Sequence, residues 1–371
     1  MLTPQDELLC HQLPTTFDHV VQSDLRWTER IVLYGFDTTG RVSVMTGMAR
    51  YPNRNVMDAY AMVTIDGTAH VARLSREISG KYDDLGAWQI GPYRYEITEP
   101  LRGVRATLGD NDHGLRLELN FAGQFPAYEQ EPAFFRTRGR VREDARRYYQ
   151  NGEISGWFEV DGERIEIDPS TWWFGRDHSW GTRHGGGGGS LGEGGGLQPS
   201  EIPDGVLYFM GIFQFDDELV HFAQRETADG QRWHFEGSIQ RPIEADVPTV
   251  PIVSVTHDLK FRDDFRIVSE GSFTADAADG SERTYSVTAL HDFWPGLAGY
   301  DMYRGYASGI WKGESYSDGF TVDLSDTAEL RPVSMLTETF VKVESSDGKV
   351  GYGLVEMVFM GRNARYGYEG Y

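Results

Sequence analysis

The chain of 371 residues has very little cysteine: Cys10 is its one thiol. A single cysteine excludes an intramolecular disulfide and a thiolate-bound metal cluster. The N-terminus lacks the basic start and apolar core of a secretory signal, and no stretch approaches the roughly 18–20 apolar residues of a membrane span. We therefore expect a cytoplasmic protein that does not insert into a membrane.

Positive charge is also scarce. Lys and Arg number 35 against 57 Asp and Glu, which gives a formal net charge of −22. Such a surface repels nucleic-acid backbones and argues weakly against an anionic substrate such as a nucleotide. The sequence also lacks a phosphate-binding glycine loop followed by Lys, and it has no His-Glu-x-x-His or EF-hand pattern. We predict no metal, no cofactor and no nucleic-acid partner.

Long amphipathic helices are hard to find, whereas turn signals recur along the whole chain. Asp-Gly, which tolerates the positive φ angles of type I′ hairpin turns, occurs seven times. Alternating apolar and polar residues flank several of these pairs, which is the pattern of half-buried strands. Sequential hairpins predict an all-β fold of antiparallel barrels or sandwiches, with one short helix around Arg142–Arg147. The pairs begin at Asp66, Asp161, Asp204, Asp229, Asp279, Asp318 and Asp347.

A glycine run between residues 185 and 196 divides the chain. Glycine loses much backbone entropy on ordering, so this composition disfavours regular structure. We predict an N-terminal β domain at 1–184, a Gly-rich linker or lid at 185–201 and a C-terminal β domain at 202–371.

The most unusual stretch lies just before this run. Residues 171–183 contain three tryptophans together with Arg176, Asp177, His178 and Arg183. A carboxylate beside an imidazole can fix its tautomer, and a tryptophan ring can stabilise a cation. The alternative interpretation is a structural plug, with Arg176 and Asp177 paired and Trp180 packed.

The stretch also carries a family resemblance. Asp177–Gly181 reads D-H-x-W-G, a motif that resembles one in the carotenoid 1,2-hydratase and AttH-like family of twin lipocalin-like proteins. Arg26–Tyr34 resembles the first strand of that superfamily, and Arg50–Arg54 resembles the segment that follows. The resemblance implies two consecutive lipocalin-like β-barrels or sandwiches with few short helices.

It also implies a cofactor-free site in which an acid protonates a double bond and aromatic rings stabilise the carbocation. His178 would then be the water-positioning base and Asp177 its orienting partner. The hydratases have a Tyr-x-Asp pair after the motif, but 206–217 contains none, so the general acid is not identified. Substrate contacts are predicted from Trp180, Arg176, Arg183, Trp173 and Tyr208.

We therefore predict a hydratase, lyase or isomerase that acts on an apolar terpenoid or aromatic molecule. The first alternative is a lipocalin-like carrier of a hydrophobic ligand without catalysis. The second is a structural protein without a ligand. The sequence leaves homo-oligomerisation open.

Overall fold

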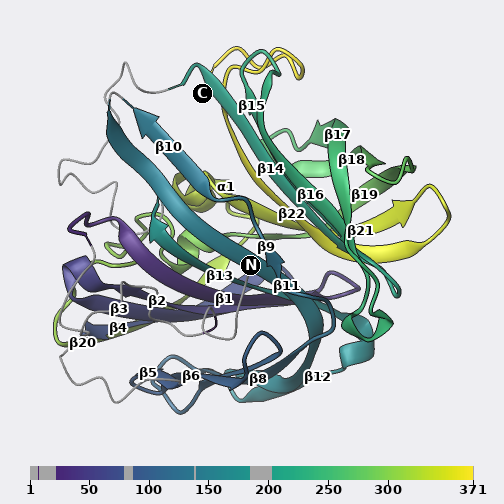
Figure 1. Ribbon diagram of the computed structural model, residues 1–371. Helices are drawn as coiled ribbons and strands as arrows, with labels where there is room; N and C mark the ends of the chain where they lie inside the picture. The colour runs from purple at the N-terminus through teal and green to yellow at the C-terminus, as the bar shows by residue number, and fades with distance from the viewer. Residues whose placement is uncertain (1–6, 8–21, 79–86, 138, 184–202, 371) are drawn as a thin grey trace. The chain divides into compact units, whose positions relative to one another are not determined.

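The computed structural model describes residues 7, 22–78, 87–137, 139–183 and 203–370 (Figure 1). Antiparallel strands dominate these residues, which confirms the all-β class. They contain one α-helix, α1 (Thr327–Leu330), and no helix among them is long and apolar enough to cross a bilayer. The 3-10 turns are η2 (Pro52–Arg54), η3 (Pro169–Thr171), η5 (Ile243–Ala245), η6 (Pro295–Ala298) and η7 (Arg331–Val333).

The chain divides into two compact units. The first comprises Met1–Asp37, Arg41–Gly196 and Leu297–Asp326, and the second comprises the remaining segments. Leu297–Asp326 therefore belongs to the first unit, although the sequence boundary placed it in the second half. The predicted linker at 185–201 lies outside the described residues.

The first unit is one long antiparallel sheet in the order β20-β4-β3-β2-β1-β13-β11-β8-β7-β6-β5, and β9, β10 and β12 also pair with β11. The strands are β1 (Trp27–Asp37), β2 (Val42–Tyr51), β3 (Val56–Ile65), β4 (Thr68–Glu77), β5 (Ala87–Ile90), β6 (Tyr93–Glu99), β7 (Gly103–Leu108), β8 (Leu115–Gly123), β9 (Tyr128–Glu129), β10 (Ala133–Thr137), β11 (Arg140–Val160), β12 (Glu163–Ile167), β13 (Trp172–Thr182) and β20 (Ser315–Asp323).

This sheet folds back on itself, so that residues from β1–β4 and β5–β8 share one hydrophobic core. Ile31, Leu33 and Phe174 belong to that core, and we call the face that bears them the inner face. Strand β20 joins the far edge of the sheet by pairing with β4, where Asp318 lies opposite the buried Arg73 and forms an ion pair with it.

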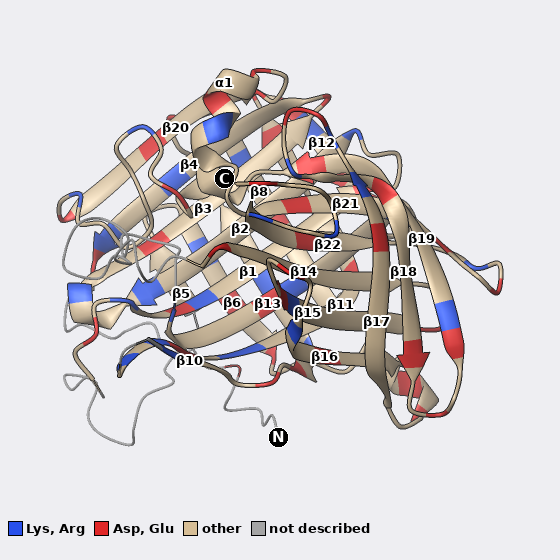
Figure 2. Ribbon diagram, turned by 90° about the horizontal axis from the view of Figure 1, so that it is seen from above, with Lys and Arg blue, Asp and Glu red and all other residues tan. Residues whose placement is uncertain are grey.

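The second unit is a closed barrel in the order β14-β15-β16-β17-β18-β19-β21-β22. Its core is rich in aromatic rings, whereas charged residues occupy exposed positions along β17 to β19 (Figure 2). The strands are β14 (Gly205–Gln214), β15 (Leu219–Thr227), β16 (Arg232–Gln240), β17 (Val250–Phe261), β18 (Val268–Ala277), β19 (Glu282–Phe293), β21 (Thr337–Ser345) and β22 (Val350–Gly361).

The short helix expected around Arg142–Arg147 does not form, because this segment is part of β11. Its backbone pairs with β10 on one side and β13 on the other. Arg142, Ala145 and Tyr148 are buried in this strand. Pairing with two neighbouring strands therefore outweighs the local helix propensity of the arginines and glutamate.

The Asp-Gly pairs divide into three groups. Both residues have positive φ at Asp66-Gly67 and Asp161-Gly162, as type I′ turns require. Only the glycine has positive φ in the pairs that begin at Asp229, Asp279 and Asp347. The turn prediction is wrong at Asp204 and Asp318, where Gly205 begins β14 and Gly319 lies inside β20.

Gly67→Ala tests the turn chemistry in isolation. Gly67 has φ +82°, and an added Cβ would meet no atom within 4 Å, so only the backbone conformation opposes the substitution. We expect the free energy of unfolding to fall by about 1–2 kcal/mol, measured by urea denaturation. Gly109→Ala is the matched control, because Gly109 has no positive φ and its Cβ would make ordinary contacts. Equal effects of the two substitutions would contradict the turn assignment.

Candidate functional site

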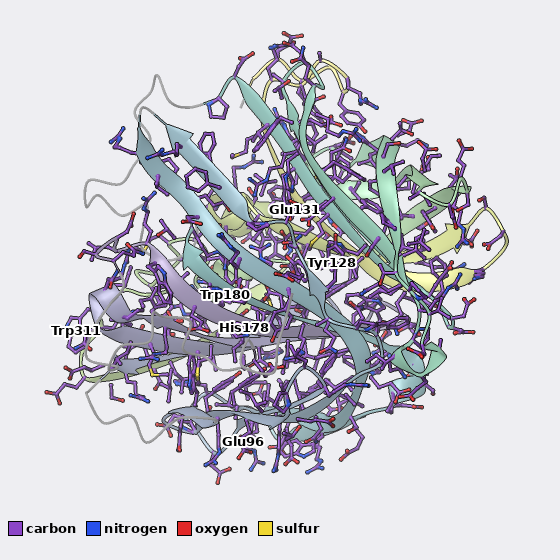
Figure 3. The ribbon with its side chains drawn as sticks, in the orientation of Figure 1. Glu96, Tyr128, Glu131, His178, Trp180 and Trp311 are labelled. Carbon is purple, nitrogen blue, oxygen red and sulfur yellow. The ribbon has the colours of Figure 1, made fainter. Side chains whose placement is uncertain are left out.

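Strand β13 carries the unusual stretch and lies between β1 and β11. His178 is opposite Ile31 of β1, and Arg176 is opposite Leu33. Because side chains alternate along a strand, Arg176, His178 and Trp180 share the inner face with these core residues. Figure 3 shows His178 and Trp180 on this strand.

The alternation also separates residues that the sequence analysis grouped together. Asp177 and Trp173 lie on the opposite face of β13, so the adjacent Asp177 does not orient the His178 imidazole. Trp173 packs there against Tyr34 and Phe36, with ring centroids 5.9 and 5.6 Å away. The expected plug pair of Arg176 with Asp177 is excluded for the same reason.

The other two predicted contacts are also apart from His178. Arg183 follows the end of β13 and donates to Ser179 Oγ at 2.8 Å. Ser179 is on the face of β13 opposite His178. Tyr208 lies on β14 in the second unit, so the inner-face cluster of the first unit is assembled without it.

His178 is held by two partners from neighbouring strands. Its Nε2 lies 3.0 Å from Oε1 of Glu29 on β1, and its Nδ1 lies 3.1 Å from the hydroxyl of Tyr148 on β11. All three side chains are buried. The orienting carboxylate that the sequence analysis assigned to Asp177 is therefore supplied by Glu29, 149 positions away in the chain.

Arg176 holds the carboxylate of Glu7 on the same inner face. Arg176 Nη1 donates to Glu7 Oε1 at 2.6 Å, and Nη2 donates to Oε2 at 2.8 Å. Burial alone would raise the pKa of Glu7, but the Arg176 guanidinium, together with His178, outweighs burial and holds that pKa below its ordinary value. Glu7 is therefore an ionised carboxylate at neutral pH.

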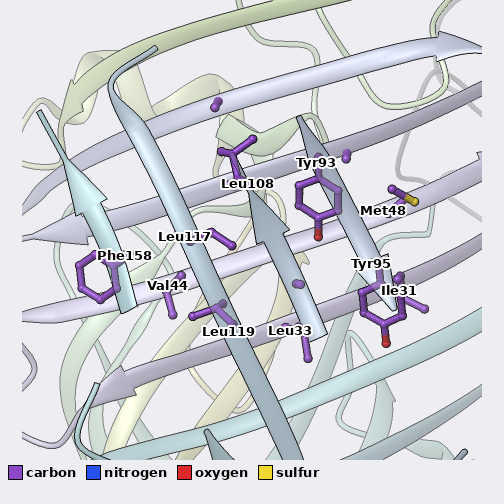
Figure 4. Packing of buried hydrophobic residues seen from close by; sticks show 14 of the residues in the cluster. Ile31, Leu33, Val44, Met48, Tyr93, Tyr95, Leu108, Leu117, Leu119 and Phe158 are labelled. Atoms are coloured by element: carbon purple, nitrogen blue, oxygen red, sulfur yellow. The ribbon is translucent and has the colours of Figure 1, made fainter. Parts of the chain in front are cut away.

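Two further groups complete this part of the site. Gln150 Oε1 accepts from Arg176 Nε at 3.0 Å and Nη2 at 2.7 Å, while the Leu101 amide donates to Glu7 Oε2 at 2.6 Å. Tyr95 belongs to the adjoining core with Ile31 (Figure 4). Burial raises the pKa of Tyr95, so it remains a neutral phenol.

The hydrogen bonds determine how many protons this cluster holds. Tyr148 has one hydroxyl proton and donates it to Glu7 Oε1 at 3.0 Å. Because Tyr148 has no second proton, its contact with His178 requires a proton on Nδ1 of the imidazole. The contact between His178 Nε2 and Glu29 Oε1 holds one further proton between the two groups. Every contact in the chain then contains one proton.

Trp180 borders this chain of hydrogen bonds. Its ring centroid lies 5.4 Å from that of His178 and 6.5 Å from that of Tyr148, both in edge-on geometry. The two polar rings and the indole therefore form one contiguous aromatic group.

The opposite face of β13 carries a second charged cluster. Arg147 Nε lies 3.7 Å from Asp177 Oδ2, and burial raises the pKa of Asp177 although Arg147 and Arg183 oppose that effect. Asp177 Oδ1 is buried without a hydrogen-bond partner. Arg147 and Arg183 repel each other. Burial has the largest effect on the pKa of Arg183, followed by the charge of Arg147, and both lower it.

Arg30 and Asp58 extend this second cluster within the first unit. The Arg30 guanidinium lies 4.2 Å from the ring centre of Tyr300 and donates to the Tyr51 hydroxyl at 2.7 Å. Asp58 accepts from the Gly309 amide at 2.6 Å. Burial raises the pKa of Asp58 to about 6, against the opposing effect of Arg30.

Sequence reasoning missed the residues that complete the inner-face cluster. Glu29 lies within the first-strand segment, Arg26–Tyr34, but nothing in that segment marks it as the partner of His178. Tyr148 and Gln150 lie just after the segment Arg142–Arg147, where a helix was expected. An alternating strand pattern through β11 would have placed Tyr148 and Gln150 on one face.

Comparisons with known proteins place the whole chain in one family. A model for a family of unknown function, DUF8625, matches residues 2–369. The chain belongs to this family. No curated protein matches the sequence significantly.

Solved structures share its fold at low sequence identity. A protein classed as AttH from Nitrosomonas europaea is 13% identical, with a TM-score of 0.54 over 94% of this chain and 96% of that one. Kievitone hydratase from Nectria haematococca is 11% identical, with a TM-score of 0.50 over 90% and 89%. CghA with Sch210972 is 10% identical, with a TM-score of 0.52 over 96% and 97%. The fold is therefore that of AttH-like and hydratase proteins, and at these identities the likeness concerns the fold alone.

The second unit contains a cluster of the same residue types. His257 Nε2 lies 2.9 Å from Glu226 Oε1, and its Nδ1 lies 2.6 Å from the Tyr366 hydroxyl. His257 packs edge-on against Phe209 of the barrel core, with ring centroids 4.8 Å apart. In the described part of the chain, no group of three His, Cys, Asp or Glu side chains is placed to hold a metal ion.

Asp58 predicts a pH dependence of stability. A carboxyl whose pKa rises on folding, here to about 6 from 3.8, binds more protons in the folded state between these values, so stability falls as pH rises through this window. Asp58→Asn removes that titration. We expect its free energy of unfolding, relative to the unmodified protein, to increase by about 2–3 kcal/mol between about pH 4 and about pH 7. Urea denaturation across this range measures the difference, and a difference independent of pH would contradict the assignment.

Proposed function

We propose that the first unit is a cofactor-independent acid/base enzyme of the hydratase, lyase or isomerase type, acting on an apolar terpenoid or aromatic substrate. The observation that supports the proposal most directly is the buried chain Glu29–His178–Tyr148. His178 Nε2 lies 3.0 Å from Glu29 Oε1, and His178 Nδ1 lies 3.1 Å from the Tyr148 hydroxyl. The chain ends at a hydroxyl that has a proton to donate. Such a hydroxyl is the general acid that the D-H-x-W-G motif alone did not supply.

In the forward direction Tyr148 would transfer its proton to one carbon of a double bond. His178 Nδ1 would return a proton to the Tyr148 oxygen, and Glu29 would stabilise the imidazolium before this transfer. Water would add to the resulting carbocation in a hydratase and lose one proton back through Tyr148 to His178. In an isomerase the carbocation would instead lose a proton from a neighbouring carbon, and this proton would return through Tyr148 to His178.

The surroundings of Tyr148 support an apolar substrate. The inner face combines Trp180 with the hydrophobic core around Ile31, Leu33 and Phe174. Burial and the charge of Glu7, against the opposing charge of Arg176, raise the pKa of Tyr148 well above its ordinary value, so the hydroxyl is protonated at neutral pH.

The runner-up is a carrier that binds a hydrophobic ligand without catalysis. One observation favours it: Glu226, His257 and Tyr366 reproduce the same three residue types in the core of the second unit. A Glu–His–Tyr cluster can therefore serve to satisfy buried polar groups alone. The two functions differ in whether the first cluster transfers a proton to carbon.

Deuterium incorporation separates the two functions. The full-length protein is incubated in D₂O with limonene, linalool and 4-vinylphenol, and the products are analysed by mass spectrometry and NMR. An acid/base enzyme should place deuterium on carbon in one of these or a related alkene. Tyr148→Phe and His178→Gln should each lower that rate by about 10²–10⁴-fold, because general acid–base catalysis contributes this much.

The second unit provides matched controls. Tyr366→Phe and His257→Gln make the same chemical changes in a buried Glu–His–Tyr cluster and should leave the rate of deuterium incorporation unchanged. Thermal unfolding of all four variants corrects for loss of folded protein. If His178→Gln is destabilised yet retains the full rate per folded molecule, His178 has no catalytic role. Ligand retention without exchange would favour the carrier.

A further inference from the structure

The carboxylate of Glu7 is held by four hydrogen bonds from the first unit. Its Oε1 accepts from Arg176 Nη1 at 2.6 Å and from the Tyr148 hydroxyl at 3.0 Å. Its Oε2 accepts from Arg176 Nη2 at 2.8 Å and from the Leu101 amide at 2.6 Å. These donors, which we call the carboxylate cradle, come from β13, β11 and the β6–β7 turn.

The cradle is held in place by a residue that does not touch Glu7 in these contacts. Gln150 accepts from Arg176 through Oε1 and donates from Nε2 to the Leu101 carbonyl at 2.7 Å and the Phe125 carbonyl at 3.0 Å. The amide group of Gln150 therefore fixes both the guanidinium and the Leu101 backbone. Donors arranged in this way form a preorganised anion site.

The β6–β7 turn supplies one of the donors. Leu101 has φ +58° at the third position of this turn, which the Arg102 amide closes by donating to the Glu99 carbonyl at 3.0 Å. The Leu101 amide donates to Glu7 Oε2, so each carboxylate oxygen has one donor in addition to Arg176.

We propose that the carboxylate cradle binds a carboxylate of the substrate and that Glu7 occupies it as an internal competitor. The inference rests on the proposed function, since it gives the substrate class of the same site: an apolar unsaturated carboxylic acid. Because the Tyr148 hydroxyl lies 3.0 Å from Glu7 Oε1, a ligand carboxylate in the cradle is in contact with the proposed acid/base cluster. Arg176 supplies the positive charge that recognises such a ligand despite the net charge of −22.

The test uses cinnamate, an unsaturated aromatic carboxylate, and its neutral analogue cinnamamide. Dissociation constants are measured by isothermal titration calorimetry for the full-length protein and for Glu7→Ala. Removal of the competing carboxylate should tighten cinnamate binding at least tenfold and leave cinnamamide binding unchanged. The double variant with Glu7→Ala and Arg176→Met removes both buried charges together. It should lose the gain in cinnamate affinity that Glu7→Ala alone produces.

Two outcomes would overturn the inference. The first is cinnamate binding that does not differ from cinnamamide binding in Glu7→Ala. The second is cinnamate binding that is equally tight with and without Arg176. Either result would leave Glu7 as the counter-ion of Arg176 and nothing more. If Glu7→Ala yields no folded protein, Glu7→Gln keeps the side-chain volume and is judged by the same two comparisons.

The binding measurement is independent of turnover. In one outcome cinnamate binds through Arg176, but neither cinnamate nor any other alkene tested gains deuterium from D₂O. This outcome would refute the acid/base function and leave the carboxylate site intact. Deuterium incorporation into a neutral alkene by the unmodified protein, without a gain in cinnamate affinity in Glu7→Ala, would refute the carboxylate site and leave the acid/base function intact.

Discussion

The arrangement of polar side chains on the inner face of the first unit depends on the buried ion pair between Arg176 and Glu7. A guanidinium removed from water is costly unless a carboxylate and further hydrogen bonds surround it. Glu7 provides the charge, and Gln150 provides two more acceptor contacts. Because Glu7 is ionised, it accepts the single hydroxyl proton of Tyr148, whose oxygen also contacts His178 Nδ1. The hydrogen bonds around the Tyr148 hydroxyl therefore depend on one pair of opposite charges.

The geometry of a β-strand explains why a contiguous motif does not form a contiguous site. Asp177 and His178 are neighbours in sequence but point to opposite faces of β13, and the imidazole takes its carboxylate from Glu29 instead. The sequence motif correctly singled out this strand as unusual. The role of each side chain in the motif depends on which residues of β1 and β11 lie opposite it. Tyr148 is paired with His178 in the β11–β13 register, 30 positions apart. Register is a property of the assembled sheet and cannot be derived from the sequence of any single segment.

Local signals predicted the class of fold better than its assembly. The Asp-Gly turns and the lack of amphipathic helices were sufficient for an all-β prediction, because both depend on backbone preferences of adjacent residues. The helix expected at Arg142–Arg147 failed since β11 pairs with strands on both sides. Strand β20 could not have been assigned to the first unit from its own residues. Its place depends on pairing with β4, where Asp318 meets Arg73 across 245 positions.

The two Glu–His–Tyr clusters show which feature separates chemistry from packing. In the second unit Tyr366 can donate its only proton to His257, and the imidazole can pass its own to Glu226. In the first unit the Tyr148 hydroxyl donates to Glu7 Oε1 and also contacts His178 Nδ1, so a carboxylate and an imidazole share one hydroxyl. The residue types of the two clusters are the same, but the first cluster adjoins the buried ion pair of Arg176 with Glu7, whereas His257 packs against Phe209 of the barrel core. That additional ion pair is the physical reason why the proposed chemistry is assigned to the first unit.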